Sequence, residues 1–133
     1  KRIPEPTIAN TAFQRSYLYY LVARTYHYNQ QYDREVEALN KALGLDAAYL
    51  EALTQLAAAY TELNQFQAAE QALRSALSVS PGAEQDAAIY VQIGRLYERE
   101  GRPYEAITAY GQALEAQSDN IEAREALRRL TAS

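Results

Sequence analysis

The sequence predicts an all-α fold built from antiparallel helix pairs, and three observations support this prediction. Apolar residues recur at helical spacing along the 133-residue chain. Equivalent residues also recur at offsets of 34 and then 37 positions, which indicates internal repeats. Short polar segments separate the apolar runs, so each helix is expected to turn back on the one before it. The length favours a single domain.

The repeat offsets divide the chain into three units and two terminal segments. The units cover residues 16–49, 50–83 and 84–120, and the third begins with a short insertion. Residues 1–15 are predicted to be a tether that leads into a helix start, because Pro4 and Pro6 force extended backbone before them. Residues 121–133 carry one apolar stripe and are predicted to form a capping helix over the last unit.

Each unit is expected to contain two helices joined by a polar turn. In the first unit, the leading helix has an apolar face at i, i+3, i+4 and i+7, formed by Tyr19, Val22, Ala23 and Tyr26. The turns are predicted at residues 29–33, 64–66 and 101–104, and Asp33 is placed to cap the second helix of the first unit. The extra residues before the third unit predict a longer helix or loop there.

The repeated columns resemble the tetratricopeptide repeat (TPR) family. The third unit matches the family pattern at Tyr90, Ile93, Gly94, Tyr97, Ala106, Tyr110 and Ala113, and the second at Leu53, Leu56, Ala57, Tyr60, Ala69, Leu73, Ala76 and Pro81. The first unit departs from it, with Glu35 in a small-residue column, which suggests a looser or shifted helix contact. The resemblance implies a right-handed superhelical array, an α-solenoid, whose first helices line a concave groove for partner peptides.

The groove positions that the resemblance implies are rich in aromatic residues at one end. Six of the twelve tyrosines lie within residues 17–32. A helical wheel places three of them opposite the predicted core face, where the repeat's own packing does not use them. The predicted partner-binding residues are Tyr17, Tyr20, Arg24, His27, Tyr28, Gln55, Gln92, Arg95 and Arg99. Two alternatives remain open at this point: residues 1–15 or a second copy of the chain could cover the same rings.

One known binding mode of the family is not expected here. Chaperone-binding members hold a C-terminal carboxylate with Lys, Arg and Asn side chains, and the matching positions are Tyr20, Arg24, Gln55, Ala88 and Gln92. Only Arg24 is a cation. The sequence therefore predicts no such carboxylate clamp.

Composition argues against several functional classes. The net charge of −4 and the pI of about 5.0 disfavour nucleic acid as a partner. Cysteine is absent, His27 is the single histidine, and the glycines are scattered, so no metal site, cofactor site or catalytic centre is predicted. No apolar run is long enough to insert into a membrane.

These observations predict a protein–protein interaction scaffold, with a role in assembly of a larger complex, rather than an enzyme. Two alternatives remain. The chain could self-associate into a homo-oligomer, or it could be a membrane-anchored assembly factor, such as one for photosystem I, tethered by a segment that precedes residue 1. The second alternative rests on the family resemblance alone, and the sequence assigns no compartment.

Overall fold

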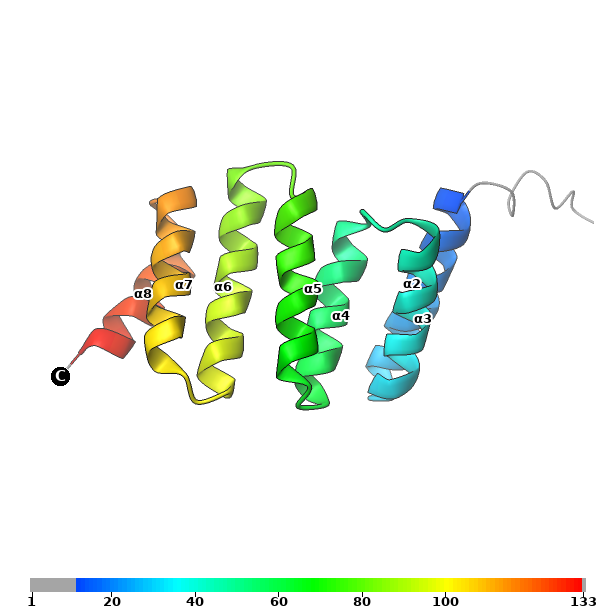
Figure 1. Cartoon of the computed structure of the whole chain (residues 1–133), viewed down its shortest axis with the longest axis horizontal. Helices are drawn as coiled ribbons and strands as arrows, with labels where there is room; N and C mark the ends of the chain where they lie inside the picture. Colours follow the sequence, from blue (N-terminus) through cyan, green and yellow to red (C-terminus); the bar gives the residue numbers. More distant parts are fainter. Residues whose placement is uncertain (1–11, 133) are drawn as a thin grey trace, which may run out of the picture. The chain divides into compact units, whose positions relative to one another are not determined.

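The computed structural model describes residues 12–132, and this part of the chain is all α-helical (Figure 1). Its seven helices are α2 (Ala12–Tyr28), α3 (Tyr32–Leu45), α4 (Leu50–Glu62), α5 (Phe66–Val79), α6 (Ala83–Arg99), α7 (Pro103–Ala116) and α8 (Ile121–Thr131). The predicted fold class is confirmed. Residues 1–11 of the predicted tether lie outside the described residues. The chain divides into two compact units, unit 1 up to Ala72 and unit 2 from Leu73.

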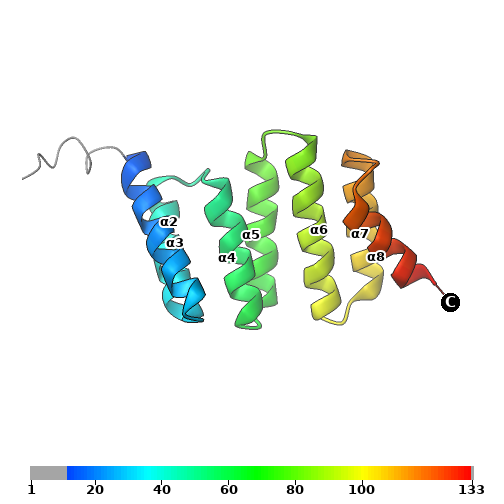
Figure 2. The same ribbon diagram turned by 180° about the vertical axis from the view of Figure 1, so that it is seen from behind.

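In unit 1, α2 and α3 form an antiparallel pair, and α4 packs against α3. Figure 2 shows α2 and α4 on one side of this unit, with α3 behind α2. Ala23 and Leu39 are fully buried where the first pair meets. A small residue on α2 lets the two helices approach closely, and the leucine fills the space that remains.

In unit 2, α6 and α7 form a second antiparallel pair, and α8 packs against α7. Gly94 occupies the column of Ala23, and the ring of Tyr110 occupies the column of Leu39. A Cβ atom at Gly94 would lie 2.7 Å from the Tyr110 ring, so the larger side chain requires glycine opposite it. The prediction of a final capping helix agrees with α8, which buries Ala123 and Ala126.

The three turns inside the helix pairs share one backbone conformation. Gln30, Asn64 and Gly101 all have positive φ, at 58°, 60° and 78°. In each case, the next residue donates its backbone N–H to the carbonyl of the repeated tyrosine, at Tyr26, Tyr60 and Tyr97 respectively. Only glycine adopts this conformation without steric cost, so the first two turns are strained relative to the third.

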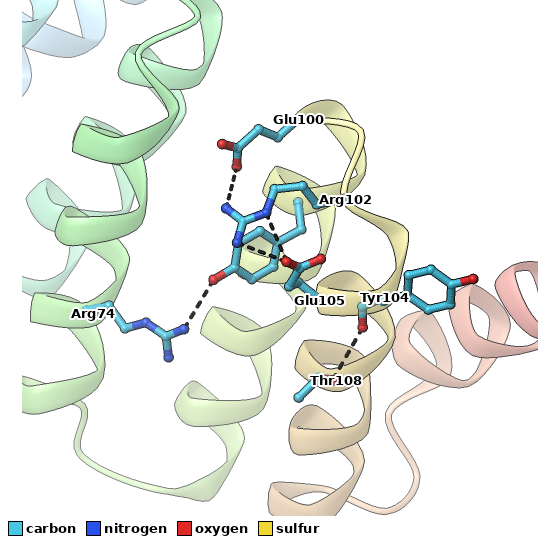
Figure 3. Close-up of polar contacts among 7 residues, drawn as sticks. Arg74, Glu100, Arg102, Tyr104, Glu105 and Thr108 are labelled. Carbon is cyan, nitrogen blue, oxygen red and sulfur yellow. Dashed lines mark hydrogen bonds and ion pairs between the residues drawn. The ribbon is translucent and has the colours of Figure 1, made fainter.

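The turn between α6 and α7 is further held by Arg102. Its guanidinium lies 4.7 Å from the ring centroid of Tyr97. It also donates hydrogen bonds to Glu100 and Glu105, which lie on either side of it in Figure 3. Pro103 occupies the first turn of α7, where its missing N–H costs nothing.

One predicted detail of the helix ends differs in the structure, and another, the longer helix before the third repeat, is confirmed. Asp33 does not cap α3, because the helix begins at Tyr32 and Gln31 is its N-cap residue. Asp33 instead lies in the first turn, where its charge interacts favourably with the helix dipole. The residues inserted before the third repeat extend the helix, so that α6 has 17 residues where α4 has 13.

Candidate functional site

The helix α2 has a core face, an exposed apolar face and a third face that carries the predicted binding residues. We call this one the tyrosine face and define it as Tyr17, Tyr20, Arg24, His27 and Tyr28 of α2 with Gln55 of α4. Arg24 and His27 are exposed, Tyr20 and Gln55 are half-buried, and Tyr17 and Tyr28 are 46% and 77% exposed. Most of this aromatic surface is therefore accessible in the described part of unit 1.

At one end of the tyrosine face, Tyr20 packs against Tyr49, the residue that precedes α4. The two ring centroids are 5.1 Å apart, and the planes are tilted by 41°. Partial burial raises the pKa of Tyr49 to about 12, and neighbouring Tyr20, Glu51, Tyr17 and Asp46 add to the effect. Tyr49 is a neutral phenol at physiological pH, as tyrosine generally is, and it packs against the ring of Tyr20.

At the centre of the tyrosine face, a buried carboxylate joins three helices. Glu35 of α3 is fully buried. One of its oxygens lies 3.2 Å from Nδ1 of His27 on α2, and the other accepts a hydrogen bond of 2.7 Å from Nε2 of Gln55 on α4. A buried carboxylate needs such partners, because an unpaired one would carry a large desolvation cost.

The sequence predicted a looser or shifted helix contact at Glu35, and the structure shows which groups accommodate this side chain. The carboxylate extends from the small-residue position to groups on two other helices. It holds His27 and Gln55, both predicted binding residues, in fixed orientations. The ring of His27 also contacts the rings of Tyr28 and Tyr32 edge-on, at centroid distances of 6.4 and 5.9 Å.

The second face of α2 is apolar and exposed, and we call it the outer apolar face. It consists of Leu18, Leu21 and Val22. Val22 was predicted to be a core residue, but it is 45% exposed, and Tyr19 and Tyr26 beside it are only half-buried. The equivalent Leu56 of the second repeat is buried, because α4 packs against α3. A hollow of about 350 Å³ lies beside Val22, between α2 and α3.

Unit 2 carries the other predicted binding residues, on α6. Arg95 forms an ion pair with Glu122 of α8. One turn further on, Glu98 accepts hydrogen bonds from Arg129, at 2.6 and 3.1 Å, and from the Tyr110 hydroxyl, at 2.5 Å. These groups surround a hollow of about 220 Å³. The hydrogen bonds from Arg129 lower the pKa of Glu98, and the Tyr110 hydroxyl adds to that shift.

The remaining predicted residues of unit 2 differ in burial. Arg99 is exposed at the end of α6, whereas Gln92 is half-buried. The side-chain oxygen of Gln92 is buried and has no hydrogen-bond partner among the described residues. Gln92 occupies the repeat position that is equivalent to Gln55. The amide of Gln55 has a hydrogen-bond partner in Glu35, whereas the amide oxygen of Gln92 has none among the described residues.

Sequence reasoning identified the exposed members of the site but missed Glu35 and Tyr49. A glutamate in a column of alanines was the available signal, because such a residue must either distort the packing or find a partner. The predicted binding residue Arg95 is paired with Glu122, which lies 27 positions later in the chain, and the sequence analysis did not foresee this pair.

Within residues 12–132, no three acidic or histidine side chains lie close enough together to hold a metal ion. No helix in the same range has the length and apolar character needed to cross a bilayer.

Comparisons with known proteins agree on the architecture. The family described as "Tetratricopeptide repeat" matches residues 16–49, 50–82 and 87–120. The Arabidopsis OM64 TPR domain is similar, with 25% identity, 90% of this chain and 97% of that domain covered, and a TM-score of 0.76. The N-terminal domain of stress-induced protein-1 (STI-1) from C. elegans shares 16% identity over 93% of this chain and all of that domain, with a TM-score of 0.82.

A third structure was solved with a peptide. It is the first TPR of Spaghetti (RPAP3) bound to the HSP90 peptide SRMEEVD, with 23% identity, 90% of this chain and 92% of that chain covered, and a TM-score of 0.76. At these identities the likeness to STI-1 and to RPAP3 establishes the fold. A comparison with curated protein sequences found no match.

Proposed function

Because the chain belongs to the tetratricopeptide repeat family, a non-catalytic scaffold family, we propose that it binds a segment of a partner protein on the tyrosine face. The observation that carries this proposal is the accessibility of Tyr17, Tyr28 and Arg24 on a helix whose core contacts are made by other residues. Tyrosine and arginine are the residues that most often anchor protein interfaces. The scaffold would serve in the assembly of a larger complex.

The internal contacts of the tyrosine face support the same proposal. Tyr49 holds the ring of Tyr20, and Glu35 holds His27 and Gln55. Side chains that are already fixed lose little conformational entropy when a partner binds, so a prearranged surface binds more tightly than a flexible one. In unit 2, we propose Gln92, Arg95 and Arg99 as additional contacts with the partner.

The direct test is affinity capture from an extract of the source organism, followed by titration with the purified partner. The double variant Tyr20→Ala/Arg24→Glu is expected to weaken binding by about 30-fold or more, because the loss of even one such anchor typically costs about 2 kcal/mol. Tyr104→Ala is the matched control, since Tyr104 is 82% exposed on α7 and lies outside the proposed site. Equal affinity of the double variant and the control for the partner would show that the tyrosine face is not the binding site.

The partner is not expected to be an HSP90 tail, although RPAP3 was solved with one. The positions that would form a carboxylate clamp hold Tyr20, Gln55, Ala88 and Gln92, and Arg24 is the single cation among the five. Calorimetry with the peptide SRMEEVD should detect no binding at micromolar concentrations. Micromolar affinity would show that this chain uses a different set of side chains as a clamp.

A second candidate function, self-association, is favoured by the outer apolar face. Leu18, Leu21 and Val22 expose apolar surface next to a hollow, which is typical of a surface that packs against another helix. Sedimentation over a range of concentrations would detect a dimer. The variant Leu18→Lys/Val22→Lys should then be monomeric, and a wild-type chain that stays monomeric at all concentrations would exclude this candidate.

A further inference from the structure

The outer apolar face of α2 can be compared with the same face of α4, because each of these helices begins a repeat. Leu18 and Val22 occupy the repeat positions of Ala52 and Leu56, which lie 34 residues later. Ala52 and Leu56 are 0% and 6% exposed, since α3 packs against α4. Leu18 and Val22 are 48% and 45% exposed. Within residues 12–132, α2 therefore lacks a helix in the position that α3 takes on α4.

The exposed face of α2 is also more apolar than its covered counterpart on α4. Leu18 stands where α4 has Ala52, and Leu21 stands where α4 has Gln55. Gln55 donates a hydrogen bond to Glu35 of α3, whereas a leucine side chain has no group to offer. The end face of a repeat array that stays in water is generally polar, and adjacent exposed leucine and valine side chains are typical of a protein contact. The helix that covers α2 is therefore expected to be apolar or small where α3 has Glu35.

The hollow beside this face has an excess of positive charge. Its lining includes the exposed side chains of Arg34, Glu37 and Lys41 from α3, so two cations and one carboxylate border it among the described residues. The Lys41 ammonium lies 5.8 Å from the ring centroid of Tyr19 on α2. Because α2 and α3 are antiparallel, Arg34, two turns before Lys41, lies toward the other end of the hollow.

Two further charges lie near the hollow but outside its lining. Arg15 is one turn before Leu18 on α2, and Asp33 is one turn before Glu37 on α3. These two charges are opposite in sign and offset each other, so the excess positive charge of the hollow remains. A covering helix with carboxylates along one edge would complement Arg34 and Lys41.

From this arrangement we propose that the outer apolar face binds an amphipathic helix of a partner protein, with its apolar side on Leu18, Leu21 and Val22 and an acidic edge over Arg34 and Lys41. A second copy of the chain is a poorer occupant, because a two-fold contact would gather the same two cations of both copies around one interface. This surface is separate from the tyrosine face, so the inference does not depend on the function proposed for that face.

The test uses two helical peptides, each about 18 residues long, since shorter helices are marginal in water. Both carry the same leucine and alanine residues along one side, and they differ only in whether glutamate or lysine fills the flanking positions. Each peptide is titrated at low salt into the ¹⁵N-labelled chain. The glutamate peptide should shift the backbone signals of Leu18, Leu21 and Val22. It should bind about threefold to tenfold more tightly than the lysine peptide, in line with a few exposed charge pairs.

Two variants with changes at exposed positions separate the apolar contact from the charge contact. Leu21→Gln restores the residue of the second repeat and should weaken the binding of both peptides by about fivefold to tenfold. Arg34→Glu/Lys41→Glu should reverse the order of the two affinities. Ile121→Gln is the matched control, because Ile121 is an aliphatic residue of α8 that is 67% exposed and lies outside the proposed surface. This control should leave both affinities unchanged.

Several outcomes would overturn the inference. Equal affinities of the two peptides for the wild type would show that the cations of the hollow do not select the partner helix. Signal shifts confined to Tyr17, Arg24 and Tyr28 would place the peptide on the tyrosine face, which would favour the proposed function and contradict this inference.

The absence of binding would overturn it as well. If neither peptide shifts the signals of the outer apolar face at millimolar concentration, this face does not bind a helix of the proposed kind. Sedimentation of the same samples then identifies the alternative occupant, since a dimer that Leu21→Gln dissociates would assign the face to a second copy of the chain.

Discussion

The helix pairs α2–α3 and α6–α7 follow the same repeat pattern but differ at three places: the contact between the helices, one small-residue position and the turn. The first pair combines Ala23 with Leu39, where the second combines Gly94 with Tyr110. The first pair has Glu35 in a column where the second has Ala106. In the turn of the first pair, Gln30 has the positive φ that Gly101 has in the turn of the second pair.

The difference teaches how a repeat can keep its architecture while its surface changes. In α2–α3, a buried carboxylate holds polar groups of the tyrosine face from behind. In α6–α7, the equivalent column is filled by alanine, and polar side chains of α6 are instead held by the capping helix, through Arg129 and Glu122. The first arrangement leaves aromatic rings accessible, whereas the second neutralises surface charge.

The largest effect should come from making the second pair resemble the first at one position only. Gly94→Ala gains helix propensity but places a methyl group against the Tyr110 ring, so we expect a net loss of about 2 kcal/mol in unfolding free energy. Urea denaturation measures it. Adding Tyr110→Leu recreates the Ala–Leu combination of the first pair, and the double variant should be more stable than Gly94→Ala alone.

Gly111→Ala is the control for this prediction. It lies on α7 with no atom within 4 Å of the added methyl group, so it should gain up to about 1 kcal/mol from helix propensity. If Gly94→Ala were as stable as this control, the close approach of Tyr110 would not constrain the helix pair.

The next effect concerns the carboxylate of the second pair, Glu98. Its pKa is lowered by Arg129, so its contribution to stability is present above its unfolded value of about 4.5 and is lost as the pH falls through the lowered folded value. Glu98→Gln should cost about 1–2 kcal/mol at pH 7. The difference in unfolding free energy between variant and wild type should then shrink as the pH is lowered below 4.5. A constant difference down to pH 2 would contradict this assignment.

A smaller effect is expected when the two turn residues are exchanged. Gln30→Gly relieves a positive φ of 58° and should stabilise the chain by about 0.5–1 kcal/mol, whereas Gly101→Gln should destabilise it by about 1 kcal/mol. Thermal unfolding of both variants measures the pair of effects. If Gln30→Gly were destabilising as well, the side chain of Gln30 would make contacts that outweigh its backbone strain.

The smallest effect should come from the ion pair between Arg95 and Glu122. Both side chains are 60% exposed, so Arg95→Ala is expected to change the unfolding free energy by less than about 0.5 kcal/mol. A stability measurement alongside a partner titration distinguishes two roles for Arg95. A loss of several kcal/mol in stability would show that the pair holds α8 in place and is more than a surface contact.

The sequence alone predicted the repeats, the helix pairs, the capping helix and the accessible residues Tyr17 and Tyr28. Those features depend on short spacings: a period of 3.6 residues within a helix and a recurrence of 34 to 37 residues between repeats. Local spacing also separated the core face of α2 from the tyrosine face, since both lie on one helix.

The tertiary structure alone decided what happens to charged side chains and to unpaired faces. Glu35 contacts His27 and Gln55, which are 8 and 20 positions away, and Arg129 reaches Glu98 across 31 positions. Val22 has the pattern of a core residue, but its exposure depends on whether another helix covers it. A residue's type sets the cost of burying it, whereas the groups that offset this cost come from other helices, and only the folded chain brings them together.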